Sequence, residues 1–175
     1  MHYLKVTAQD RSGNGKADAV LLHFHNGSTQ LVHEAFAVDM SANGSIEFGF
    51  AGDINGDGEQ NLHDQLLLTT FAEVFLQLGW FNAGDNWERC LKIGATDYHG
   101  DGSPNVVTLE FSEDEGSPCS SIRIRTAAAY DGDNDGILES FTNSDVNADG
   151  IANKADKLLL RKIAEAYLAF HWFGA

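Results

Sequence analysis

The chain has 175 residues, of which 43% are hydrophobic and 10% aromatic, so it can bury a core and is not a disordered segment. Its 11 basic and 26 acidic residues give a net charge of −15, which disfavours nucleic acid and anionic membranes as partners and favours cations. No apolar run reaches the roughly 18 residues of a membrane helix, and "MHYLKVTAQD" lacks the apolar stretch of a signal peptide. We therefore expect no membrane insertion and an export signal that was removed or never existed.

The first part of the chain reads as strands. Short apolar or β-branched runs occupy residues 4–8 and 17–25, and an Asn–Gly pair at 26–27 is typical of a hairpin turn before a third run at 29–38. His23 and His25 point to the same face of the second run, as two zinc ligands could, but no third ligand is expected opposite them. Solvent-facing histidines are the favoured interpretation.

Six acidic stretches punctuated by glycine share one spacing. Each has oxygen-bearing or imidazole side chains at positions 1, 3 and 5, glycine at 6, and a carboxylate or amide at 9, and two of them add an aspartate at 12. This is the ligand order of an EF-hand-type calcium loop, in which the backbone carbonyl of position 7 also binds the ion. The stretches begin at Asp10, Asp39, Asp53, Asp97, Asp131 and Asp145.

The spacing predicts a calcium-ligand set for each loop, with position 7 included for its carbonyl. Three sets are rich in Asp and Asn: Asp53, Asn55, Asp57, Glu59, Asn61 and Asp64; Asp145, Asn147, Asp149, Ile151, Asn153 and Asp156; and Asp131, Asp133, Asp135, Ile137 and Glu139. Three are more degenerate: Asp97, His99, Asp101, Ser103 and Asn105; Asp10, Ser12, Asn14, Lys16 and Asp18; and Asp39, Ser41, Asn43, Ser45 and Glu47. For the degenerate sets an ordinary turn without metal is the alternative, because Asp, Asn and Gly also form turns.

A helical period follows the loops at Asp53 and Asp145. The apolar stripes consist of Leu67, Phe71, Val74, Phe75 and Leu78 in the first helix, and of Leu159, Ile163, Ala166, Tyr167 and Phe170 in the second. Asn61 and Asn153 stand at predicted N-caps, and Asp64 and Asp156 in the first turns, where a carboxylate meets the positive helix end. The aromatic pair at Trp80 and Phe81 is expected to pack in the core.

The chain also looks duplicated. Residues 4–24 align with 91–111, and after an insertion of five residues 39–64 align with 131–156. The predicted fold is α+β, with two pseudo-symmetric repeats that each contain short antiparallel strands with calcium loops followed by one helix. The repeats span 1–81 and 91–175, joined by a linker at 82–90, and are expected to form one compact unit.

Two stretches carry a family resemblance. "DINGDGEQNLHDQLLL" and "DVNADGIANKADKLLL" resemble the calcium loop and following Leu-rich helix of type I dockerin modules. The strand-flanked loops "DRSGNGKAD" and "DYHGDGSPN" are similar to calcium loops of FG-GAP or VCBS-type extracellular repeats. The dockerin resemblance implies a calcium-fixed loop and helix, and a cohesin-type receptor as partner.

Cysteine usage and calcium both favour an oxidising, extracellular location. Cys90 and Cys119 could form a disulfide that pins the inserted segment to the neighbouring strand. Loops built partly from neutral Asn and Ser suit extracellular calcium, at about 10⁻⁴ to 10⁻³ M.

No nucleophile–base pair or phosphate-binding loop is apparent, so we expect a protein that is not an enzyme. The predicted function is an extracellular calcium-binding structural or adhesive module or assembly subunit, stabilised by several Ca²⁺ ions, up to about six. Its expected partners are copies of itself or other extracellular proteins. The alternative is a dockerin-like ligand module that binds a cohesin-type receptor.

Overall fold

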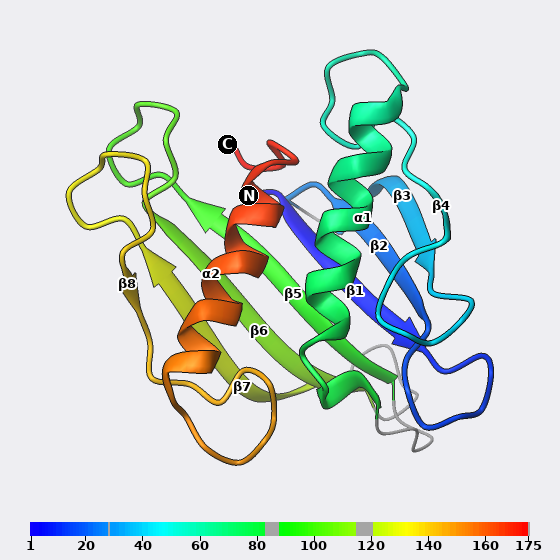
Figure 1. The fold of residues 1–175 in the computed structure, drawn as a ribbon. Coiled ribbons are helices and arrows are strands. Elements are labelled where there is room, and N and C mark those ends of the chain that lie inside the picture. Colours follow the sequence, from blue (N-terminus) through cyan, green and yellow to red (C-terminus); the bar gives the residue numbers. More distant parts are fainter. Residues whose placement is uncertain (28, 83–87, 115–120, 175) are drawn as a thin grey trace.

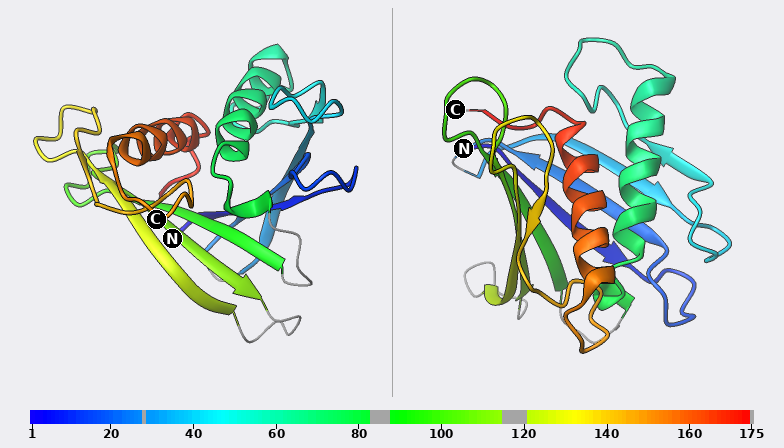
Figure 2. Two further views of the ribbon diagram at one scale, coloured as in Figure 1. Left: turned by 60° about the horizontal axis from the view of Figure 1, so that its bottom comes forward. Right: turned by 60° about the vertical axis from the view of Figure 1, so that its left-hand side comes forward.

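A computed structural model describes residues 1–27, 29–82, 88–114 and 121–174. The fold is α+β: an eight-stranded antiparallel sheet carries two helices on one face (Figure 1). Along the sheet the strand order is β4-β3-β2-β1-β5-β6-β7-β8, so β1 and β5 form the central antiparallel pair. Both views of Figure 2 show the helices side by side over the same face of the sheet.

The first three strands and both helices lie in the runs that the sequence indicates. The strands are β1 Tyr3–Gln9, β2 Ala19–His25, β3 Leu31–Val38, β4 Phe48–Phe50, β5 Glu88–Thr96, β6 Val106–Asp114, β7 Ser121–Tyr130 and β8 Ser140–Phe141. The helices are α1 Leu62–Leu76 and α2 Lys154–Leu168, and a short 3₁₀ helix covers Trp80–Asn82. The strand β5 begins inside the segment expected as a linker, 82–90, of which 83–87 lie outside the described residues.

Side chains alternate across the sheet, as the period of two requires. In β1 and β2 the residues Leu4, Val6, Val20, Leu22 and Phe24 are buried beneath the helices. Their neighbours along the chain point to the opposite face. A sheet covered on one side only needs this alternation, which antiparallel sheets commonly show.

Both helices start from a capping box. Asn61 and Asn153 are the N-caps, and the aspartate at the third helical position of each helix accepts the N–H of its N-cap. The predicted caps are therefore confirmed.

The buried stripe is as expected in α2, where Leu159, Ile163, Ala166, Tyr167 and Phe170 are all buried. In α1 it is rotated: Leu68 and Ala72 are fully buried, whereas Leu67 and Val74 are only partly buried. The run Leu66–Leu68 offers apolar residues in every direction, so packing against the sheet decides which of them faces inward.

Residues of the C-terminal segment join the two helices to the sheet. The Phe170 ring lies 5.2 Å from that of Phe71 in α1 and 5.6 Å from that of Phe24 in β2, between ring centroids. The indole N–H of Trp172 reaches the carbonyl oxygens of Tyr3 and His25 at 3.2 and 3.3 Å. One core thus draws on both ends of the chain, and Trp80 and Phe81 belong to it as predicted.

The described part of the chain contains no helix with the length and apolar character to cross a bilayer.

Phe170→Ala should destabilise the protein by about 3–5 kcal/mol, because it removes a buried ring that contacts both α1 and β2. Urea unfolding followed by circular dichroism measures this difference. Leu158→Ala on the exposed side of α2 is the matched control and should change stability by no more than about 0.5 kcal/mol. Equal effects of the two substitutions would contradict the packing described above.

Candidate metal centres

Each of the six acidic stretches forms a loop between two consecutive elements of the fold. Four connect neighbouring strands, at Asp10, Asp39, Asp97 and Asp131, and two lead from an edge strand into a helix, at Asp53 and Asp145. The β5–β6 and β7–β8 loops lie together at one end of the sheet, and the β1–β2 and β3–β4 loops at the other (Figure 1).

All six loops have the same backbone turn. In each, the carboxylate at position 1 accepts the N–H of the glycine at position 6, with N···O distances of 2.6–2.9 Å. This glycine has a φ between +82° and +91° in every loop, a region that side chains rarely adopt. The residue at position 4 also has a positive φ, from +55° to +71°, although it is alanine or asparagine in three loops.

A second contact recurs at position 5. Its side-chain oxygen accepts the N–H of position 7 in all six loops, at 2.8–2.9 Å. The side chains of positions 1 and 5 therefore accept the N–H groups of two consecutive residues, 6 and 7, whatever residues lie between them. The predicted ligands at these positions are Asp10 and Asn14, Asp39 and Asn43, Asp53 and Asp57, Asp97 and Asp101, Asp131 and Asp135, and Asp145 and Asp149.

The loops close in two ways. In the four strand loops the side chain at position 9 accepts the N–H of position 2, at 2.6–2.9 Å; these residues are Asp18, Glu47, Asn105 and Glu139. In the two helix loops the aspartate at position 12 takes over this contact: Asp64 accepts from Ile54 at 3.0 Å and Asp156 from Val146 at 2.8 Å. Position 9 is then free to cap the helix, as Asn61 and Asn153 do.

Among the described residues, two groups of three or more carboxylates each lie close enough together to bind one ion, and Asp53, Asp57 and Asp64 do not form such a group. Oxygen atoms of Asp131, Asp133, Asp135 and Glu139 all lie within 4.8 Å of one another, as do oxygens of Asp145, Asp149 and Asp156. The negative charge of Asp135, followed by desolvation, raises the pKa of Asp133 above its ordinary value. Since all these donors are oxygens, the groups fit a hard cation such as Ca²⁺ better than zinc.

The degenerate loops use position 3 differently. The imidazole Nδ1 of His99 lies 3.1 Å from Oδ1 of Asn105, and the hydroxyl of Ser41 lies 2.5 Å from Oε1 of Glu47. Ser12 reaches Asp10 at 3.3 Å. In each case the predicted ligand at position 3 is brought next to another predicted ligand of the same loop.

Backbone N–H groups lower the pKa of several of these carboxyls. The N–H of Gly15 does so for Asp10, that of Gly102 for Asp97, and that of Glu59 for Asp57. For Asp101 the largest effect is the side-chain amide of Asn134. The carboxylates are thus held in the charged form that binds metal ions.

Asn134 links the Asp131 loop to the Asp97 loop by hydrogen bonds, a contact that the sequence analysis did not predict. Its amide nitrogen donates to Oδ2 of Asp101 at 2.6 Å, and its carbonyl oxygen accepts from the amide of Asn105 at 2.5 Å. Asn134 stands at position 4 of the Asp131 loop, where Ala42 stands in the Asp39 loop.

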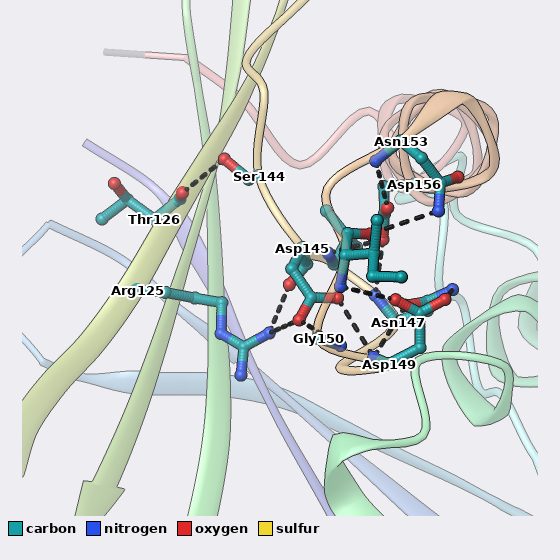
Figure 3. A network of polar contacts seen from close by, with 11 residues as sticks. Arg125, Thr126, Ser144, Asp145, Asn147, Asp149, Gly150, Asn153 and Asp156 are labelled. Atoms are coloured by element: carbon teal, nitrogen blue, oxygen red, sulfur yellow. Dashed lines mark hydrogen bonds and ion pairs between the residues drawn. The ribbon is translucent and has the colours of Figure 1, made fainter.

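Arg125 in β7 is a second residue that sequence reasoning missed. It donates to the carbonyl oxygen of Asp145, and its Nη1 lies 4.0 Å from the carboxylate Oδ2 of the same residue (Figure 3). No local motif marks this arginine, because the contact depends on the packing of β7 beside the β8–α2 loop.

The remaining candidates lie away from the loops. His23 does have a carboxylate opposite it, contrary to expectation: its Nε2 lies 3.6 Å from Oε1 of Glu34, which faces it on β3. Cys90 is buried, with its sulfur 2.9 Å from the Ser112 hydroxyl oxygen, whereas Cys119 lies outside the described residues.

Asp156→Ala should lower the free energy of unfolding by about 1–3 kcal/mol in calcium-free buffer, because it leaves the backbone N–H groups of Val146, Asn147 and Asn153 without their acceptor. Burial raises the pKa of Asp156, but these donors outweigh it and hold the pKa below its ordinary value. A lowered folded-state pKa stabilises the protein above the unfolded value near 3.8, and this contribution is lost as pH falls further.

The acid limb of the stability profile should therefore be shallower in the variant, measured by urea unfolding between pH 6 and pH 2.5. Glu165→Ala, at an exposed carboxylate of the same helix, is the control and should leave the profile unchanged. An unaltered profile in Asp156→Ala would show that the capping contacts do not hold this carboxylate ionised.

No family model, curated protein or solved structure matches the chain. The donor atoms and the turn geometry of the loops are therefore the basis for inferring what the chain binds.

Proposed function

We propose that the chain is an extracellular, non-enzymatic calcium-binding module with a structural or adhesive role, stabilised by several Ca²⁺ ions. The observation that carries this proposal is the single turn geometry repeated six times, with Asp, Asn, Ser or Glu oxygens at nearly every ligand position. Ca²⁺ takes six to eight oxygen ligands in flexible geometry, which suits loops of this kind. The Asp131, Asp53 and Asp145 loops are the richest in carboxylates.

The order of elements supports two related halves. Four strands and a helix occur twice along the chain, and the central strands β1 and β5 are antiparallel neighbours. We propose that the halves are pseudo-symmetric repeats, each built from strands, calcium loops and one helix. The same hydrogen bonds at corresponding positions of the loops support this view.

Charge favours assembly in the presence of calcium. Six divalent ions would add about +12 to a net charge of −15, which reduces the repulsion between copies. The short edge strand β4 exposes Phe48 and Phe50 next to Phe36 of β3, and exposed strand edges can pair with another chain. These features favour other copies of the chain, or other extracellular proteins, as partners.

A dockerin-like function is the second candidate. Leu62 and Leu66 are 83% and 61% exposed, one turn apart at the start of α1. An apolar pair on a calcium-fixed helix suits binding to a separate receptor domain of the cohesin type.

Calcium should stabilise the fold. Millimolar Ca²⁺ should raise the melting temperature by about 5–10 °C over excess chelator, because a ligand at 100 times its Kd adds about 2.7 kcal/mol. Differential scanning calorimetry measures the shift. Asp57→Ala should weaken calcium binding more than Asp39→Ala. Asp57 belongs to a loop with three aspartates at predicted side-chain ligand positions, and Glu59 adds a fourth carboxylate to that loop. Coincident melts in chelator and in calcium would rule out a stabilising metal.

Calcium should also promote self-association, measured by light scattering across a calcium titration. Phe48→Ser together with Phe50→Ser should reduce this association, and Leu62→Ser together with Leu66→Ser is the matched control on α1. A protein that stays monomeric in saturating calcium, yet binds a cohesin-type domain through Leu62 and Leu66, would favour the dockerin-like function instead.

A further inference from the structure

Arg125 places a permanent positive charge beside one of the two helix loops. The guanidinium carbon lies beside a pair of aromatic rings in contact, 5.8 Å from the centroid of Trp80 and 5.5 Å from that of Phe111. From there it donates to the Asp145 carbonyl and pairs with the Asp145 carboxylate (Figure 3). The side chain is only 24% exposed, so this charge is less screened than that of a surface arginine.

The carboxylate that Arg125 contacts is central to its loop. Asp145 stands at position 1 and also accepts the N–H groups of Asp149 and Gly150, at 3.1 and 2.9 Å. A guanidinium cannot lose its proton in a protein, so it remains a cation at every working pH. Part of the loop's negative charge is therefore balanced by the chain itself.

The corresponding position on β3 holds a histidine. His33 faces Phe24 beside the bulge of β2, just as Arg125 faces Phe111 beside the bulge of β6. The Nε2 of His33 lies 2.8 Å from the carbonyl oxygen of Ala51, two residues before Asp53. Among the ion pairs within the described residues, none includes a carboxylate of the Asp53 loop.

The two helix loops thus differ in charge although they share the hydrogen bonds of positions 1 and 5; of the two, only the Asp145 loop has its three aspartates within 4.8 Å of one another among the described residues. Each has three aspartates at positions 1, 5 and 12, but Glu59 adds a fourth carboxylate at position 7 of the first loop, where Ile151 stands in the second. Arg125 adds a permanent positive charge beside the second loop, whereas the basic side chain that acts on Asp57 in the first loop is the imidazole of His63. Calcium affinity in such loops rises with the negative charge at the site, to which Glu59 adds as a nearby charge, because position 7 binds through its carbonyl.

We propose that Arg125 weakens calcium binding at the Asp145 loop and holds this loop in its turn without metal, so that the Asp53 loop fills first. The proposal rests on the calcium binding proposed above. It assigns an affinity-setting role to Arg125, which acts on the ion through Asp145 and is not itself a ligand.

The test is a CaCl₂ titration followed by the backbone amide signals of Gly58 and Gly150, which occupy the same position in the two loops. In the wild-type protein the Gly58 signal should respond at lower calcium concentration than that of Gly150. Arg125→Gln should tighten binding at Gly150 by about tenfold and leave Gly58 unchanged. Arg125→Lys keeps the positive charge but not the planar guanidinium, so it should tighten binding at Gly150 by less than Arg125→Gln does.

Two controls separate charge from packing. Arg161→Gln also removes one positive charge, but from an exposed ion pair on α2. Arg89→Gln removes a cation that, like Arg125, lies near the Trp80 ring, 4.8 Å from its centroid. Neither should shift the Gly150 response by more than about twofold.

Three results would overturn the proposal. The first is a wild-type titration in which the Gly150 signal responds at lower calcium concentration than the Gly58 signal. This result needs no variant, so it remains decisive even if Arg125→Gln fails to fold. The second is a folded Arg125→Gln variant whose calcium affinity at Gly150 equals that of the wild type. This result would overturn the role of Arg125 but not the proposal that the loops bind calcium. No response at either glycine up to 10 mM CaCl₂ would contradict the calcium proposal itself, and this inference with it.

Discussion

The contact on which the structure depends is the carboxylate at position 1 of each loop accepting the N–H of a left-handed glycine at position 6. It closes six turns at the ends of the sheet strands and fixes where each following element begins. In the four loops with aspartate at both positions 1 and 5, the turn also places two negative charges within five residues. A cation bound there would reduce this repulsion, which is the physical basis of the calcium binding that we propose.

The helix loops connect this turn to the core. Ile54 and Val146 at position 2 are buried, and their N–H groups are held by Asp64 and Asp156 at the start of the helices. One aspartate therefore joins the loop, the helix cap and a core residue. In the strand loops the side chain at position 9 makes the equivalent contact, and the chain continues as a strand.

Much of this could be predicted from sequence, because the relevant interactions are local. The loops, the caps at Asn61 and Asn153, and the long strands follow from residue types at fixed spacing. The two-residue strand β8 and the orientation of α1 about its axis could not be predicted, since packing decides them. The links made by Arg125 and Asn134 also stay hidden, because they join residues that only the sheet brings together.

Calcium binding by these loops can be measured by isothermal titration calorimetry of the chelator-treated protein with CaCl₂. The account predicts that at least the three carboxylate-rich loops, at Asp53, Asp131 and Asp145, take up calcium at millimolar concentration or below. Binding should be lost stepwise when position 1 is replaced by alanine in each loop. A protein that releases or absorbs no binding heat at several temperatures, and retains no calcium in equilibrium dialysis at 10 mM, would contradict the account.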